Sequence, residues 1–138
     1  MNMRDKQARA YLKESKLSIE SAKASLERAE EKDKDLWHSV VKSSYDAMEQ
    51  AVSAMLADRG LEIPKSHPGK VEKFVNKFGE SKITEKLYKW LGKRSKSQYV
   101  DIQRGQIVVP HEIFDKIDAE ESLEDAKFVV ESIEEKLG

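Results

Sequence analysis

Apolar residues recur every three or four positions along most of this chain, which is the spacing of one face of an α-helix. The first series begins near residue 8 and consists of Ala8, Leu12, Ser15, Ile19, Ala22, Leu26 and Ala29. Lysine and glutamate fill the opposite face, and the polar run EEKDKD at 30–35 ends the series. The pattern predicts a long amphipathic helix with one solvated face.

A second helix is predicted between Trp37 and Gly60, and its apolar face is broader than that of the first. Its apolar and small positions include Val40, Val41, Ser44, Tyr45, Met48, Val52, Met55 and Leu56. Gly60 stands where a residue of left-handed conformation often caps a helix. The breadth of the face predicts a helix at the centre of a bundle, with Val41, Met48, Val52 and Met55 buried.

The second half of the chain predicts shorter elements. The segment LEIPKSHPG at 61–69 contains two prolines and a glycine, and it predicts a loop. Helical spacing returns in three stretches, with inward positions at Val71, Phe74, Val75 and Phe78, then at Ile83, Leu87, Trp90 and Leu91, and finally at Leu123, Ala126, Val130, Ile133 and Leu137. A short turn at 113–117 is expected before the last stretch. Between Lys93 and Pro110 the spacing fails, and IVVP at 107–110 predicts a short extended piece that forms no sheet on its own.

The fold class follows from these elements. We expect an all-α protein, an antiparallel bundle of four to five helices with short connections. The chain has 138 residues and no segment that resembles a linker between two cores, so residues 1–138 are expected to form a single domain.

The composition excludes several classes of protein. There is no cysteine, and no apolar run approaches the ~18 residues that a membrane-spanning helix needs. The first residues are charged and lack the apolar segment of a secretory signal, which favours a cytoplasmic protein. The histidines His38, His67 and His111 are isolated, and no glycine-rich phosphate loop is present. We therefore expect no metal and no cofactor.

Charge is strongly segregated along the chain, although the net charge is −1. Residues 65–104 hold eleven Lys or Arg against four Asp or Glu, whereas residues 105–138 hold three against ten. One helical face in the basic region carries Lys82, Lys86, Lys89, Lys93 and Lys96. Like charges at this spacing repel one another, so the face predicts a partner for them. That partner is either the phosphates of RNA or a nucleotide, or the acidic last helix.

Four segments, DLWHSVVKSSYDAMEQAVSAMLADRGLEI, KSHPGKVEKFVNKF, LYKWLGKRSKSQYVD and AEESLEDAKFVVESIEEKL, follow one another within about residues 8–137. Together they resemble the HEPN domains (higher eukaryotes and prokaryotes nucleotide-binding). The resemblance implies a helical bundle that commonly forms homodimers. It also implies a role beside a minimal nucleotidyltransferase, often in a toxin–antitoxin pair.

Ribonucleases of this family are recognised by an arginine that is followed, after four to six residues, by a histidine. Arg94 matches the arginine, but Tyr99 stands at the position of the histidine. A phenol, with a pKa of about 10, is a poor general base at neutral pH beside an imidazole at about 6.5. A shared site also needs the helix to end near Arg94, or a second protomer, because positions five apart on a continuous helix diverge by about 140°.

We therefore expect a module that binds nucleotide, RNA or a partner nucleotidyltransferase without catalysis. The expected binding residues are Lys82, Lys86, Lys89, Lys93, Arg94, Lys96 and Tyr99. Two alternatives stay open: a metal-independent ribonuclease toxin that uses Arg94 at a dimer interface, together with Tyr99 or a residue outside the motif, and a purely structural interaction protein. Among the other polar residues, His67 is expected to cap the short helix. Asp46 and Glu49 are expected to be surface charges.

Overall fold

The computed structural model describes residues 2–31, 36–96, 101–103, 106–108 and 114–137, with residues 94–96 and both strands described by their backbone alone. The helices are α1 (Met3–Glu31), α2 (Trp37–Asp58), α3 (His67–Phe78), α4 (Lys82–Lys96) and α6 (Lys116–Leu137). Two short strands, β1 (Asp101–Gln103) and β2 (Gln106–Val108), follow α4. The predicted all-α bundle is confirmed.

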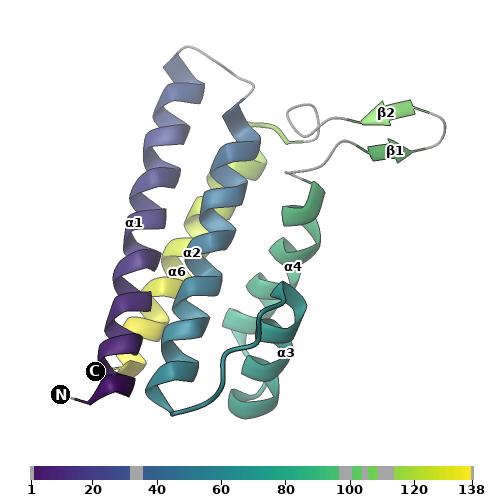
Figure 1. Cartoon of the computed structure of the whole chain (residues 1–138). Helices are drawn as coiled ribbons and strands as arrows, with labels where there is room; N and C mark the ends of the chain where they lie inside the picture. Colours follow the sequence, from purple (N-terminus) through teal and green to yellow (C-terminus); the bar gives the residue numbers. More distant parts are fainter. Residues whose placement is uncertain (1, 32–35, 97–100, 104–105, 109–113, 138) are drawn as a thin grey trace.

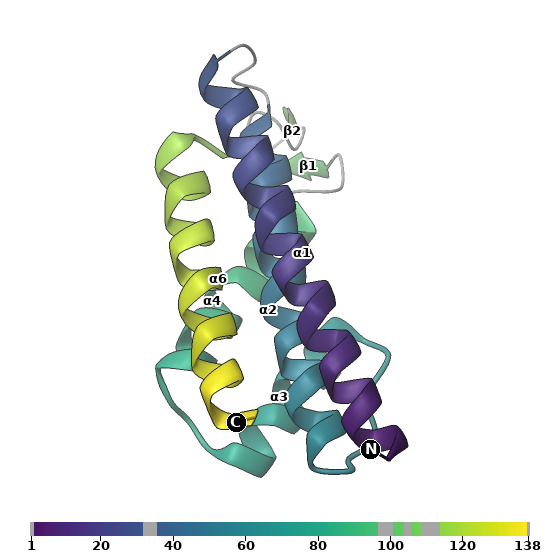
Figure 2. The same ribbon diagram turned by 90° about the vertical axis from the view of Figure 1, so that its left-hand side faces the viewer.

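The helices pack around α2. The long helices α1, α2 and α6 lie side by side, and the shorter α3 and α4 lie on another side of α2 (Figures 1 and 2). In Figure 1, α2 and α6 run in the same direction, whereas α1 and α4 run the opposite way. α1 begins and α6 ends at one end of the bundle, and the strands lie near the other end, where α4 ends.

The central position predicted for α2 is confirmed. Val41, Met48 and Val52 are fully buried, and Met55 is 3% exposed. Burial extends almost all the way round the second half of the helix, because other helices cover it on several sides. A polar residue in this part of α2 must therefore find its partners inside the protein.

The predicted glycine cap at the end of α2 is also confirmed. Gly60 has a φ of 70°, in the left-handed region that glycine adopts at low cost. The N–H of Gly60 donates to the carbonyl of Ala57, and the N–H of Leu61 donates to the carbonyl of Leu56, both at 2.9 Å. This pair of hydrogen bonds satisfies the last carbonyl groups of the helix and turns the chain toward α3.

Small residues let α1 pack closely along α2. The buried positions Ala8, Ser15, Ala22 and Ala29 recur every seven residues on one face of α1, and none is more than 3% exposed. The Ser15 hydroxyl donates to the carbonyl of Leu12 at 2.7 Å, so its polar group is satisfied within the helix. Short side chains of this kind permit a close approach of two helix backbones.

The region after α4 differs from the prediction in one respect. Residues 107 and 108 of the extended piece predicted at 107–110 belong to β2, and residues 109 and 110 lie outside the described residues. β2 does not stand alone, because it pairs with β1 in an antiparallel hairpin, with Ile102 opposite Ile107. The sequence does not predict this pairing, because the three residues 101–103 are too short a stretch for alternating side chains to indicate a strand. The predicted turn at 113–117 is described only from residue 114, and α6 begins at Lys116.

Candidate functional site

The middle of the basic face of α4 lies against α6, and three of its lysines have carboxylate partners there. Lys86 Nζ lies 2.8 Å from Asp125 Oδ1, Lys89 pairs with Glu121, and Lys93 Nζ lies 3.8 Å from Asp118 Oδ1. Lysines in ascending order meet acids in descending order, as they must where antiparallel helices pack. These three pairs are of the kind expected if the acidic last helix is the partner of this face.

Asp125 is the centre of this interface. Asp125 is 8% exposed, and each of its carboxylate oxygens has a partner. Oδ1 accepts from Lys86, and Oδ2 accepts a hydrogen bond of 2.8 Å from Trp90 Nε1. Trp90 is fully buried, and the ammonium groups of Lys89 and Lys93 lie 5.0 and 4.8 Å from the centre of its ring. The part of the basic face formed by Lys86, Lys89 and Lys93 is thus engaged in contacts within the fold.

The other candidate residues lie toward the two ends of α4. Lys82 is exposed in the first turn. Arg94 and Lys96 belong by their backbone to the last turn, and Tyr99 lies outside the described residues. α4 is described as far as Lys96 and β1 begins at Asp101, so the helix ends between these two residues, a short distance after Arg94.

A second buried carboxylate joins α2 to α3. Glu49 is 7% exposed, which corrects the prediction that it is a surface charge. Its Oε2 lies 2.6 Å from His67 Nδ1, and its Oε1 accepts from Lys70 Nζ at 2.8 Å. Glu49 is buried because the part of α2 that carries it has almost no solvated face. Asp46, one turn earlier, is partly exposed and pairs with Lys42.

The cap of α3 also differs from the prediction. Ser66, not His67, is the N-cap, and its hydroxyl accepts a hydrogen bond of 3.0 Å from Gly69 N. His67 is the first helical residue, and its ring lies edge-on to that of the buried Tyr45, with ring centres 6.4 Å apart. Glu49, His67 and Lys70 therefore fix the entry of α3 by side-chain contacts with α2.

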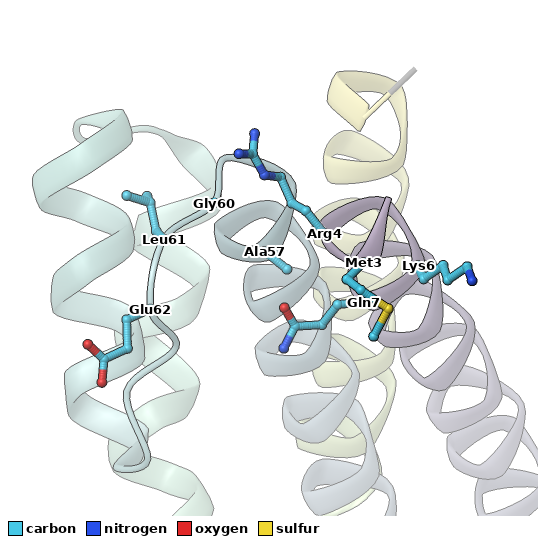
Figure 3. Close-up of a pocket in the computed structure, with 8 residues that line it drawn as sticks. All are labelled: Met3, Arg4, Lys6, Gln7, Ala57, Gly60, Leu61 and Glu62. Carbon is cyan, nitrogen blue, oxygen red and sulfur yellow. The ribbon is translucent and has the colours of Figure 1, made fainter. Parts of the chain in front are cut away.

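A hollow of about 790 Å³ lies where α1 begins and α2 ends (Figure 3). The Arg4 side chain reaches over the cap of α2, and a Cβ atom added at Gly60 would lie 3.0 Å from Arg4 Cζ. Lys6 points away from the other labelled side chains in Figure 3, and Glu62 adds the opposite charge. This mixed lining favours a structural role for Arg4 at the carbonyl end of α2.

Neither a cluster of metal-ligating side chains nor a membrane-spanning helix is found in the described part of the chain. Within those residues, no group of three or more His, Asp or Glu is arranged to hold a metal ion. None of the described helices combines the length and apolar composition that crossing a bilayer requires.

Comparison with known protein families identifies the class of this bundle. The family model of the HEPN domain matches residues 8–136, which is nearly the whole chain. The chain therefore belongs to the HEPN family. No curated protein matches it, and no solved structure does.

The sequence predicts where these charged sites lie better than it predicts which residues pair within them. The acidic last helix was one of two partners predicted for the basic face, but the sequence analysis did not single out Asp118. A signal was present, because the spacing of Asp118, Glu121 and Asp125 mirrors that of the lysines on α4. The burial of Glu49 was not predicted, because its charge favours a surface position, whereas its place on the central helix α2 determines that it is buried.

Proposed function

We propose that this HEPN domain binds RNA or a nucleotide through phosphate contacts at the C-terminal end of α4, and that it does not hydrolyse its ligand. The proposed contacts are Arg94, Lys96 and Tyr99. One observation carries the proposal: α4 is described as far as Lys96 and β1 begins at Asp101, so the helix ends within a few residues of Arg94, and residues on both sides of its end can contribute to one site. Family membership supports the class of ligand.

The lysines of the basic face are expected to add little to affinity. Lys86, Lys89 and Lys93 would each have to exchange a carboxylate on α6 for a phosphate. Such an exchange gains little, because one ion pair is lost for each one formed. The cations beyond Lys93 are the better candidates for phosphate contacts.

The absence of hydrolysis follows from the chemistry of Tyr99. A phenol at its ordinary pKa of about 10 is almost fully protonated at neutral pH, so it cannot accept the proton of a ribose hydroxyl efficiently. It can still donate a hydrogen bond to a phosphate oxygen or stack on a base. Binding without cleavage is the outcome that these properties favour.

The test is to measure binding and cleavage of labelled single-stranded RNA by the same protein samples. The double variant Arg94→Ala, Lys96→Ala should weaken binding by about tenfold at 50 mM salt and flatten the slope of log K against log salt by about 1.4. Lys93→Gln should change affinity by less than about twofold. Lys13→Ala, which removes an exposed cation on α1, is the matched control.

Each outcome of this test decides between the candidate functions. Binding that depends on Arg94 and Lys96, without cleavage, supports the proposal. Metal-independent cleavage that Arg94→Ala abolishes would establish the ribonuclease alternative. If neither RNA nor a nucleotide binds at 50 mM salt, a purely structural interaction protein is the candidate function that remains.

We propose in addition that the domain acts in the cytoplasm as a homodimer, with a minimal nucleotidyltransferase as a partner in a toxin–antitoxin pair. The family resemblance supports these partners, and the cysteine-free composition supports the location. Exposed apolar side chains, among them Tyr88 and Ile117 at 48% and 70% exposure, are available for contacts between proteins. Sedimentation that gives only a 15.8 kDa species at all concentrations would refute the homodimer.

A further inference from the structure

A groove of about 400 Å³ opens between α3, α4 and α6, at the end of the bundle opposite to the end of α4. Its apolar lining comes from Phe74 and Phe78 on α3, Ile83 on α4 and Phe128 on α6. The groove and Arg94 lie toward opposite ends of α4. Arg94 lies twelve positions after Lys82, which corresponds to about 18 Å along the helix axis, so the groove is separate from the phosphate site proposed above.

Two of the groove's aromatic rings are accessible to a ligand. Phe128 is 38% exposed and lies off the buried stripe of α6, which includes Ala126, Val129 and Val130. Phe78 is partly buried, and its ring centre lies 5.0 Å from that of Phe74, which is 2% exposed and forms the floor. An aromatic side chain held at the rim of a groove presents a flat, apolar face on which a planar ring can stack.

Cations flank both accessible rings. Lys86 Nζ lies 5.2 Å from the centre of the Phe128 ring, and Arg59 Cζ lies 5.9 Å from the centre of the Phe78 ring. Each of these two cations also pairs with a carboxylate, Lys86 with Asp125 and Arg59 with Asp58, so the unbalanced charge comes from the lysines that line the groove. Lys82 and Lys136 line the groove itself, and Glu135 is the carboxylate among its lining residues. The groove therefore pairs aromatic faces with an excess of positive charge, which is complementary to a planar ring that carries a negative group.

We propose that this groove binds the base of a nucleotide, free or within single-stranded RNA. The base stacks against Phe128 and Phe78, and Lys82 and Lys136 face its phosphate. The volume is within the range of small-molecule sites, about 300–1,000 Å³. Stacking of one base on aromatic side chains strengthens binding by about five- to a hundredfold. This inference rests on the proposed function for the class of ligand, and it adds a base-binding site at the other end of α4.

The experiment uses the full chain and adenosine monophosphate, with ribose 5-phosphate as the matched ligand that lacks a base. Phe128→Trp keeps an aromatic ring in the groove and adds an exposed fluorophore, whereas Trp37 and Trp90 are buried. Adenosine monophosphate should quench the fluorescence of this variant, and ribose 5-phosphate should not. Phe128→Ala should weaken binding of adenosine monophosphate to the protein by at least about fivefold. Circular dichroism should show that both variants keep the helical fold, since Phe128 is partly exposed.

Three results would overturn the inference. Equal affinity for the two ligands would mean that the groove binds phosphate without the base. Unchanged affinity in Phe128→Ala would mean that the base binds elsewhere. Loss of dimer in Phe128→Ala, without any nucleotide effect, would assign the groove to a contact between two copies of the chain.

The same samples separate this inference from the proposed function. If Arg94→Ala, Lys96→Ala leaves the quenching by adenosine monophosphate intact, the groove acts independently of the end of α4. If adenosine monophosphate still quenches the fluorescence but RNA affinity does not depend on Arg94 or Lys96, the base-binding groove is supported and the proposed phosphate site is refuted.

Discussion

Asp125 and Glu49 have the same structural role in two parts of the molecule, because each joins a short helix to a long one. Each is a nearly buried carboxylate, and each accepts from one lysine and one ring nitrogen. Asp125 joins α6 to α4, and Glu49 joins α2 to α3. The two short helices of the bundle are therefore each tied to a long helix by a carboxylate that water hardly reaches.

The partners of the two carboxylates differ in their access to water. The ring donor to Asp125 is Trp90, which is fully buried. The ring partner of Glu49 is His67, whose side chain is 43% exposed. If its carboxylate is removed, His67 can hydrogen-bond to water, whereas Trp90 cannot. The comparison teaches that the cost of losing a buried carboxylate depends on how well its partners can rehydrate.

The largest effect is expected at Asp125. Asp125→Ala leaves the buried Nε1–H of Trp90 without an acceptor and Lys86 without its ion pair, which should lower the free energy of unfolding by about 2–4 kcal/mol. Urea denaturation followed by circular dichroism measures the change. Glu124→Ala, an exposed neighbour on α6, is the control and should stay within about 0.5 kcal/mol of the parent protein. Equal losses in both variants would show that the network at Asp125 contributes nothing specific.

A smaller effect is expected at Glu49. Glu49→Ala should lower the free energy of unfolding by about 1–2 kcal/mol, because His67 rehydrates while Lys70, whose side chain is 19% exposed, does so only in part. The same denaturation experiment applies, with the exposed Glu72 of α3 replaced by Ala as the matched control. A loss larger than that of Asp125→Ala would reverse the comparison between the two carboxylates.

The fold was more accessible to prediction from the sequence than these two networks. Helical spacing alone located α1 and α2 and the glycine cap, because the burial of apolar residues determines those features. The hairpin was missed because strand pairing joins residues with little local signal. The prediction for Glu49 was wrong, and nothing in the sequence distinguishes Asp125 from the other acids of α6. The reason is that the burial of a polar residue depends on what packs against its helix, which the local sequence does not reveal. Arg94 and Tyr99 could be located by the family motif alone.

The smallest effect is expected at Asp115, a carboxylate that is hydrogen-bonded but lies in water. Asp115 precedes α6 and accepts from the N–H of Asp118 at 2.9 Å, and the Asp118 carboxylate accepts from the N–H of Asp115 at 3.2 Å. The hydrogen bond from the Asp118 backbone holds the pKa of the Asp115 carboxyl below its usual value. A lowered pKa in the folded state means that this contribution to stability is present above the unfolded pKa of about 3.9 and is lost as the pH falls through the folded value.

Asp115→Asn should therefore lower the Tm slightly at pH 7, and the difference from the parent protein should shrink as the pH falls below about 4. Thermal denaturation at pH 7, 5 and 3 measures this trend, with Glu120→Gln as a control because Glu120 is an exposed carboxylate on the same helix. A Tm difference that stays constant down to pH 3 would mean that the Asp115 carboxylate does not stabilise the start of α6 through its charge. If all three predictions hold, the stability lost on removing each carboxylate follows how little water reaches its partners, with the largest loss for Asp125, a smaller one for Glu49 and the smallest for Asp115.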